Sequence, residues 1–202
     1  MSVDMNSTTW DIPLFEVLNF EGPAWFDSLM ATISGIVMWV PLYLLIIYMV
    51  WRKYSWRGIL AFIVAVGFAV AFADIVAGIF KHSGPLKHLW PEFPVRQRPM
   101  FSDMVADVHV VSTRHGEFGT VSAHAATIVS LALLSSFAVR KVWFTVVMVC
   151  VALLICYSRI YLACHFPQDI LLGAGVGAVA GGCGVLIFRW IAKVGRESSG
   201  KE

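Results

Sequence analysis

Residues 142–191 read VWFTVVMVCVALLICYSRIYLACHFPQDILLGAGVGAVAGGCGVLIFRWI. The apolar residues on each side of the polar break number about 20, the length that a helix needs to cross the hydrocarbon core of a bilayer. Three charged or titratable side chains occupy the break, Arg159, His165 and Asp169. A charge close to a membrane span costs free energy and is usually retained for function. The stretch therefore predicts two membrane helices that meet at a chemical site.

The spacing within the break suits a nucleophile and its partner. Pro167 is tolerated in the first turn of a helix, so a helix that starts there places Asp169 about one turn beyond His165. A hydrogen bond between the ring and this carboxylate would fix the tautomer and raise the basicity of the other ring nitrogen. Arg159 adds a planar, permanently charged group that matches the oxygens of a phosphoryl group. We expect the chemistry of the protein here.

The composition places the rest of the chain in a membrane. Of the 202 residues, 58% are hydrophobic and 14% are charged, and the mean hydropathy is +0.76, which lies outside the range of soluble domains. Spans are predicted at 29–50, 58–80, 121–139, 142–162 and 170–191. The predicted fold class is all-α, a polytopic membrane helix bundle of about five transmembrane helices. These helices belong to one domain, residues 29–192.

The two ends of the chain are predicted to lie outside this domain. Residues 1–28 combine acidic residues with a broken apolar pattern, which favours an amphipathic segment in the membrane interface. The same residues contain no Lys or Arg, so we expect no cleavable signal peptide, which needs a basic start. The tail 193–202 is expected to be disordered and cytoplasmic.

The positions of the basic residues predict the orientation of the bundle. With five spans, nine Lys and Arg residues fall on one side of the membrane: Arg52, Lys53, Arg57, Arg140, Lys141, Arg189, Lys193, Arg196 and Lys201. An excess of Lys and Arg marks the cytoplasmic side. The long loop 81–120 and the break at 163–169 are then outside the cytoplasm, so the site is expected to face outward.

The loop 81–120 is the only long polar stretch, and connections of this length are usually functional. It contains Arg96-Gln97-Arg98-Pro99, preceded by Lys81 and Lys87. Clustered guanidinium groups bind oxyanions, but they bind anionic lipid headgroups equally well. Arg114, in the same loop, is expected either to support a headgroup without taking part in chemistry or to be an exposed charge with no role.

A third cluster, Thr120-Val121-Ser122-Ala123-His124-Ala125, stands where the third predicted span begins. Ser122 can donate to a phosphate oxygen, and the free amides of a helix start favour an anion. His124 titrates in the range that suits protonation of a leaving alkoxide. A single histidine at a helix end is more often structural, but three such clusters on one face favour a phosphoryl site.

These residues resemble the type 2 phosphatidic-acid phosphatase superfamily, which also holds glucose-6-phosphatase and the vanadium haloperoxidases. Its third motif, Ser-Arg-x5-His-x3-Asp, is matched in full by residues 158–169. Its second, Pro-Ser-Gly-His, keeps the serine and histidine of Val121-Ser122-Ala123-His124. Its first, Lys-x6-Arg-Pro, keeps Arg98-Pro99, but Pro91 occupies the lysine position. Lys81 is the preferred counterpart of this lysine and Lys87 the alternative.

The resemblance implies a metal-independent and cofactor-free hydrolase. His165 would attack phosphorus and form a phosphohistidine, with Asp169 orienting the ring. His124 would protonate the leaving oxygen and later activate water. The phosphoryl oxygens would be held by Arg98, Arg159, Ser122 and Lys81, and the possible substrate-binding residues are Lys87, Arg96 and Arg114.

The resemblance also implies a lipid substrate in the bilayer, with no nucleic acid and no obligatory protein partner. The chain is similar to small bacterial members that act on lipid A phosphates or undecaprenyl diphosphate, in the inner membrane with the site facing the periplasm or exterior. Phosphatidylglycerophosphate or phosphatidic acid is the alternative substrate. Rival functions are a vanadate-dependent haloperoxidase and a non-catalytic lipid-binding or transport protein. Asp74 is expected to be a buried charge, structural or else catalytic.

Overall fold

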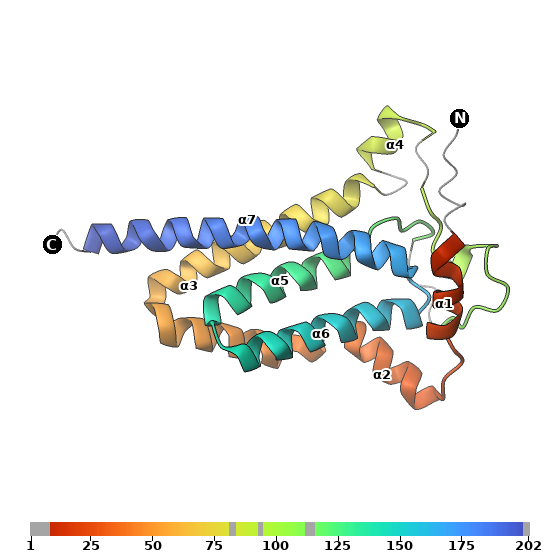
Figure 1. Ribbon diagram of the computed structural model, residues 1–202, viewed down its shortest axis with the longest axis horizontal. Coiled ribbons are helices and arrows are strands. Elements are labelled where there is room, and N and C mark those ends of the chain that lie inside the picture. Colours follow the sequence, from red (N-terminus) through yellow and green to blue (C-terminus); the bar gives the residue numbers. More distant parts are fainter. Residues whose placement is uncertain (1–8, 81–83, 93–94, 112–115, 200–202) are drawn as a thin grey trace.

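The computed structural model describes residues 9–80, 84–92, 95–111 and 116–199, and its regular elements are helices joined by loops (Figure 1). Its α-helices are α1 (Ile12–Leu18), α2 (Ala24–Ser34), α3 (Val40–Ile79), α4 (Pro85–Leu89), α5 (Ala123–Val139), α6 (Val142–Tyr161) and α7 (Pro167–Ser199). Short 3-10 helices occur at Thr9–Asp11, Val37–Trp39 and Pro99–Phe101. Within the described ranges β-pairing is limited to an isolated bridge between Gln97 and Phe118. The all-α prediction is confirmed.

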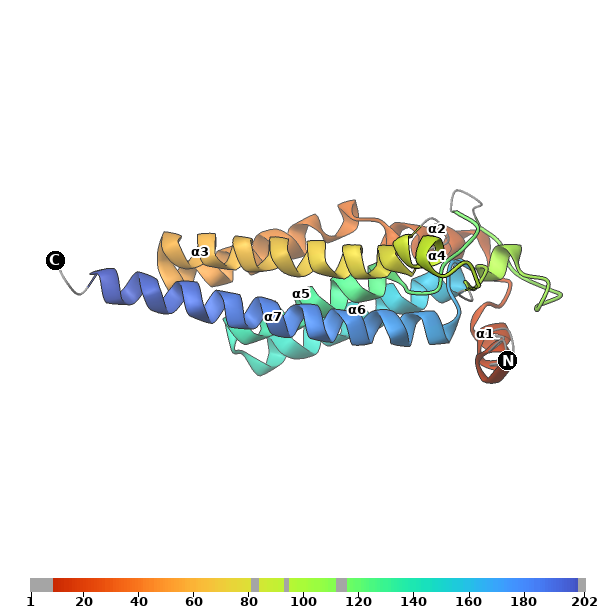
Figure 2. The same cartoon turned by 90° about the horizontal axis from the view of Figure 1, so that it is seen from above.

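Four long helices form an elongated bundle, as Figures 1 and 2 show. Helix α3 turns back on itself at the left of Figure 1, so that its two arms, residues 40–54 and Trp56–Ile79, both run along the bundle. The turn between α5 and α6 lies at the same end, which we call the basic end. The start of α7, the end of α6 and the helix α1 lie at the opposite end, which we call the site end.

The helices agree with a membrane bundle, although the number of spans differs from a simple count of apolar stretches. Three helical segments are long and apolar enough to cross a bilayer: Trp56–Ile79, Val142–Tyr161 and Pro167–Ala192. The predicted span 29–50 is broken, because α2 and the segment Val37–Tyr54 meet at an angle of 69°. Helix α5 has 17 residues, or roughly 26 Å. Five spans therefore remain a prediction.

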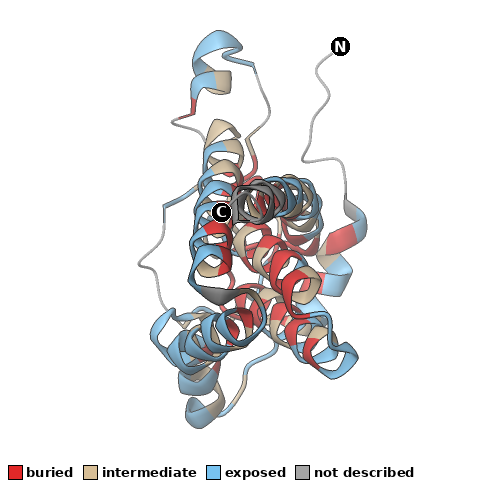
Figure 3. Cartoon of the chain, turned by 90° about the vertical axis from the view of Figure 1, so that its left-hand side faces the viewer, coloured by how far each residue is buried: buried red, intermediate tan, exposed pale blue. Residues whose placement is uncertain are grey.

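Small residues bring α5 and α7 into close contact. A Cβ atom on Gly173 would overlap the carbonyl oxygen of Ser122, and one on Gly177 would overlap that of Ala126. Close approach through small residues is how membrane helices gain packing without a hydrophobic driving force. In the end view of Figure 3 the buried residues lie where helices face one another, and the outer faces are exposed. This packing fixes the start of α5 beside the start of α7.

The basic end is stabilised by cations that meet helix ends. The Lys53 ammonium donates to the carbonyl oxygens of Ala138 at 2.9 Å and Val139 at 3.1 Å. These are among the last carbonyls of α5, which lack helical partners and carry the negative end of the helix dipole. Arg140 follows in the left-handed conformation, with φ of 56°, and ends the helix.

Three features bear on the predicted arrangement. Phe15 in α1 is fully buried and lies with its ring centroid 5.1 Å from that of Phe166, so part of the N-terminal segment packs on protein, while its place in the membrane interface stays a prediction. Helix α7 continues to Ser199, past the predicted start of the tail, and the predicted disorder of the tail stays untested. Asp74 is exposed on α3, so the expectation of a buried charge was wrong.

Candidate active site

The turn between α6 and α7 holds His165 in a fixed position at the site end. The backbone amides of Cys164 and His165 both donate to the carbonyl oxygen of Arg159, at 3.0 and 3.3 Å. Asp169 then closes the start of α7, because its Oδ2 accepts from the amide of Phe166 at 3.0 Å. A side chain in the first turn that bonds back to the residue before the helix is half of a capping box. As a result His165 is only 3% exposed.

The two ring nitrogens of His165 face different groups. Nδ1 lies 3.2 Å from the carbonyl oxygen of Gly119 and 3.5 Å from Oδ2 of Asp169. Nε2 lies 3.3 Å from Nη1 of Arg98. A carbonyl oxygen can only accept, so Nδ1 carries the proton and Nε2 presents its lone pair toward the guanidinium group. Asp169 lies one turn away as predicted, but the nearer acceptor is the carbonyl of Gly119.

Two arginines close enough to act on His165 each keep an unused donor. Nη1 of Arg98 donates to the carbonyl oxygen of Cys164 at 3.0 Å, and Nη1 of Arg159 donates to the hydroxyl of Ser34. The Nε–H groups of both arginines are buried without a hydrogen-bond partner. In the described part of the chain, no carboxylate lies within 4.0 Å of either guanidinium group. An anion with several oxygens would satisfy these donors.

The electrostatics of this group favour a neutral imidazole. Burial lowers the pKa of His165 well below its usual value, and the charges of Arg98 and Arg159 lower it further, with a smaller contribution from His124. Burial also lowers the pKa of Arg98, although a guanidinium stays protonated in proteins. The ring is therefore an unprotonated nucleophile, held against two positive charges, at neutral pH.

The loop segments on either side of the isolated bridge complete the site. The amide of Arg98 donates to the carbonyl oxygen of Glu117 at 2.9 Å, and the amide of Gly119 donates to that of Arg96 at 3.0 Å. A Cβ atom on Gly119 would lie 3.1 Å from Cε1 of His165 and 3.2 Å from two carbons of Arg98. Gly119 therefore supplies a carbonyl oxygen as acceptor, and its lack of a side chain leaves room for His165 and Arg98. Sequence reasoning missed it, although it stands two residues before the second motif.

The second motif lies at the start of α5, as predicted. Ser122 is fully buried; its Oγ accepts from the amide of Ala125 at 3.4 Å, and its own amide donates to the carbonyl oxygen of Asp169 at 3.1 Å. A hydroxyl that accepts in this way can still donate its proton. His124, one residue into α5, is exposed, and its charge acts on His165. The second and third motifs therefore meet at one place.

The remaining predicted residues are not all at this place. Arg96 is only 3% exposed, and its guanidinium group makes two hydrogen bonds to Asp11, so it differs from the expected substrate-binding role. Lys87 is carried by α4, which projects away from the bundle in Figure 1. Lys81 and Arg114 lie outside the described residues.

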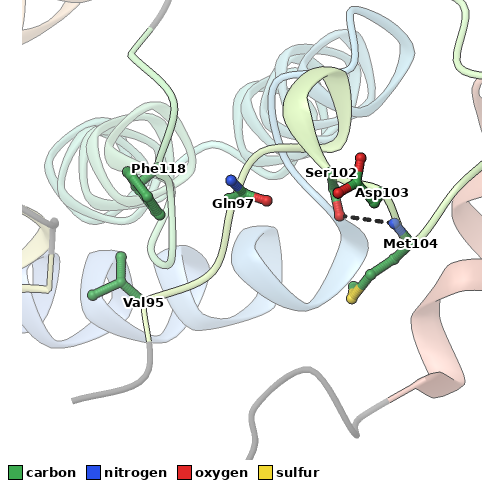
Figure 4. Close-up of a pocket in the computed structure, with 6 residues that line it drawn as sticks. All are labelled: Val95, Gln97, Ser102, Asp103, Met104 and Phe118. Carbon is green, nitrogen blue, oxygen red and sulfur yellow. Dashed lines mark hydrogen bonds between the residues drawn. The ribbon is translucent and has the colours of Figure 1, made fainter. Parts of the chain in front are cut away.

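A hollow of about 250 Å³ opens on the other face of the segment that carries Arg98. It is lined by Val95, Gln97, Ser102, Asp103, Met104 and Phe118 (Figure 4). Side chains alternate between faces of an extended segment, so Gln97 points into the hollow while its neighbour Arg98 faces His165. The hollow offers an amide, a hydroxyl, a carboxylate and one aromatic ring.

Comparison with known sequences identifies the family of this chain. The model of the PAP2 superfamily matches residues 62–196. The lipid A 4'-phosphatase of Bacteroides thetaiotaomicron is 34% identical over 187 residues, which cover 90% of this chain and 77% of that protein. The lipid A 4'-phosphatase of Porphyromonas gingivalis is 30% identical over 168 residues, covering 83% of this chain and 68% of that protein.

Solved structures share the fold at lower identity. The crystal structure of LpxE from Aquifex aeolicus superposes with a TM-score of 0.59 at 18% identity, covering 94% of this chain and 99% of that one. A PAP2-type phosphatidylglycerolphosphate phosphatase from Bacillus subtilis gives a TM-score of 0.58 at 17% identity, covering 96% and 88%. The family model matches more than half of the chain, and both curated relatives are at least 30% identical. The chain therefore belongs to the PAP2 superfamily and is a membrane phosphatase.

Proposed function

We propose that the protein hydrolyses the 4'-phosphate of lipid A, an acylated disaccharide, through a phosphohistidine on His165. The observation that carries this proposal is the pair of contacts on the imidazole. Nδ1 is held by the carbonyl oxygen of Gly119 at 3.2 Å, and Nε2 faces the guanidinium group of Arg98 at 3.3 Å. Phosphoryl transfer requires a nucleophile beside a cation that can bind the phosphoryl oxygens, since positioning and charge neutralisation supply most of the catalysis. His165 and Arg98 have this arrangement.

In the first step Nε2 of His165 attacks phosphorus. The N–P bond forms as the bond to the sugar oxygen breaks, and His124 gives its proton to that oxygen. Arg98, Arg159 and the hydroxyl of Ser122 hold the three non-bridging oxygens of the transferred phosphoryl group, which carry negative charge in the transition state. Sugar alkoxides are poor leaving groups, so a proton donor is needed at this step.

In the second step water attacks the phosphohistidine. His124 takes a proton from the water, the N–P bond breaks, and inorganic phosphate leaves while Nε2 regains its lone pair. The carboxylate of Asp169, 3.5 Å from Nδ1, favours the positive charge that the ring carries during both steps. The charge that a divalent metal would supply is already present in the guanidinium groups of Arg98 and Arg159, which supports a metal-independent reaction.

The place of the site supports a lipid substrate. The turn that carries His165 connects two helices, Val142–Tyr161 and Pro167–Ala192, that are long enough to cross a membrane. A lipid with its phosphate at the interface reaches such a turn while its acyl chains remain in the bilayer. The basic residues at the opposite end of the bundle, among them Lys53 and Arg140, support an orientation with the site outside the cytoplasm.

The names of the relatives and the hollow near the site support a substrate whose phosphate is carried by a sugar, as in lipid A. Both curated relatives carry the name lipid A 4'-phosphatase. Gln97, Asp103 and Ser102 line the hollow with groups that hydrogen-bond sugar hydroxyls, and Phe118 adds an aromatic ring.

The proposal is tested by phosphate release from the purified protein in detergent, with EDTA present throughout. The substrates are lipid A, undecaprenyl diphosphate, phosphatidylglycerophosphate and phosphatidic acid. We expect lipid A to be hydrolysed fastest, with loss of the 4'-phosphate identified by mass spectrometry, and vanadate to inhibit. Preference for another of these lipids would overturn the substrate alone, whereas strict dependence on a divalent metal would overturn the mechanism.

A further inference from the structure

Asp11, near the N-terminus, is a buried carboxylate far from the three motifs in sequence. It is fully buried and lies before the region that the family model matches, residues 62–196. Oδ2 accepts from Nη1 of Arg96 at 2.7 Å, and Oδ1 accepts from Nη2 at 2.9 Å. Removing a buried ion pair from water costs several kcal/mol per ion, and only good geometry with further hydrogen bonds offsets this cost.

Asp11 makes a further hydrogen bond, which connects it to the active site. Oδ2 of Asp11 also accepts from the amide of Gln168 at 3.1 Å. This amide belongs to the first turn of α7, where amides lack helical partners and the positive end of the helix dipole favours a carboxylate. Asp11 therefore caps α7 from another part of the chain, one residue before Asp169.

Arg96 makes the second connection between Asp11 and the site. Its guanidinium carbon lies 3.7 Å from the ring centroid of Phe166, and its Nη1 lies 3.9 Å from Oδ1 of Asp169. The other oxygen of Asp169, Oδ2, is the one near His165 Nδ1, at 3.5 Å. Arg96 thus shares its charge between two carboxylates, one of which is the partner of the proposed nucleophile.

We propose that Asp11 and Arg96 are positioning residues of the active site, which hold the side chain of Asp169 in place for His165. Asp11 keeps the guanidinium of Arg96 from pairing fully with Asp169, so Asp169 remains available to the imidazole. The positive charge of Arg96, 3.9 Å from Oδ1 of Asp169, favours the carboxylate form of that side chain. The inference rests on the proposed role of His165, and it makes the N-terminal segment part of the catalytic apparatus.

The test compares D11N, R96Q, the double variant D11N/R96Q and the control D27N, all in the full chain. Asp27 is a carboxylate of the same N-terminal region, which accepts from the hydroxyl of Tyr161 and lies 2.8 Å from Nε2 of His109. It makes no contact with Asp169. Thermal unfolding, kcat and KM for lipid A and for p-nitrophenyl phosphate, and the pH dependence of kcat are measured for each.

We expect D11N and R96Q each to lower kcat roughly 10–100-fold with little change in KM, as groups that orient a catalytic partner do. D27N should keep the wild-type kcat per folded molecule. The double variant removes both members of the Asp11–Arg96 ion pair and so leaves neither of them buried without the other. It should therefore unfold at a higher temperature than either single variant. Its kcat should stay low, because Asp169 still lacks Arg96.

The pH dependence gives a signature that a purely structural role would not produce. Protonation of the coupled His165–Asp169 pair inactivates the enzyme at low pH, and the charges facing this pair are those of Arg96, Arg98, Arg159, His124 and Asp11. Loss of the positive charge in R96Q should move the acidic limb to higher pH by roughly one unit, and loss of the negative charge in D11N should move it to lower pH.

Two outcomes would overturn the inference while leaving the proposed function intact. One is a wild-type kcat in folded D11N. The other is a double variant that recovers both thermal stability and kcat, with no change of its acidic limb, since the pair would then be structural only. If the wild-type protein releases no phosphate from either substrate, the proposed function itself has failed.

Discussion

Lys53 at the basic end and Arg98 at the site end are both cations that donate to backbone carbonyl groups, but their surroundings differ. The Lys53 side chain is exposed, and its ammonium meets two carbonyls at the end of α5. Arg98 is partly buried, with its Nε–H unpartnered and its Nη1 beside the imidazole of His165. The first cation stabilises a helix end, and the second keeps a donor unused where a phosphate would bind.

This difference distinguishes a cation that stabilises the fold, at the basic end, from a cation available to bind substrate, at the site end. An exposed cation remains hydrated and costs little, so its pairing adds only a modest amount to stability. A buried hydrogen-bond donor without a partner lowers the stability of the folded state, because the hydrogen bonds it made to water are not replaced. Such a group is expected where a ligand supplies the missing acceptor, so substitutions at the site end should affect turnover and those at the basic end should affect stability.

The largest expected effect is at the nucleophile. His165→Ala removes the atom that attacks phosphorus, so phosphate release from lipid A should fall by about 10⁴-fold or more. The acid-labile phosphoenzyme that a rapid quench traps in the wild type should disappear. Thermal unfolding serves as the control for folding. Wild-type turnover in this variant would show that the residues at the site end do not form the active site.

The proton donor should show a smaller and substrate-dependent effect. His124→Ala is expected to lower kcat for lipid A by about 10²–10⁴-fold, because a sugar alkoxide must be protonated as it leaves. For p-nitrophenyl phosphate, whose leaving group needs no proton, much of the activity should remain. Equal losses on both substrates would show that His124 is not the general acid.

Arg98→Gln tests the unused donor directly. We expect a loss of about 10²–10³-fold in kcat, the usual cost of removing one group that stabilises transition-state charge. Because the charge of Arg98 helps to keep the pKa of His165 low, its removal should raise this pKa and move the acidic limb of the kcat/KM profile to higher pH. An unmoved limb would mean that Arg98 does not act on the imidazole.

Gly119→Ala should have an intermediate effect. Its Cβ atom would lie 3.1 Å from the ring of His165 and 3.2 Å from Arg98, so one of these side chains has to move. Misplacing a nucleophile by a few tenths of an ångström should lower kcat by about 10-fold. Gly116→Ala, in the same loop, is the matched control, because no heavy atom lies within 4 Å of its Cβ position. Equal kcat in the two variants would contradict the proposed contact.

The smallest effect is predicted at the basic end. Lys53→Met removes the donors to the last carbonyls of α5 and should lower the free energy of unfolding by about 0.3–1 kcal/mol. The kcat for lipid A should not change. A reduced kcat without a change in thermal unfolding would show that the basic end contributes to chemistry, and the comparison would fail.

The amino-acid sequence by itself determined the membrane class, the helical fold and the three clusters at the site end. These features are local, because apolar runs of about 20 residues predict spans and the residues of the second and third motifs each lie within twelve positions. The third motif in particular predicted His165, Arg159 and Asp169 as neighbours, and all three lie together.

Only the tertiary structure decided which groups touch. Asp11 and Arg96 are 85 residues apart, and Gly119 and His165 are 46 apart, so no local pattern connects them. The sequence placed Arg96 and Arg98 in one cluster, yet Arg96 is neutralised by a carboxylate from the N-terminal segment and Arg98 is not. The physical reason is that a charge takes its role from its neighbours and its exposure to water, and folding brings these neighbours from distant parts of the chain.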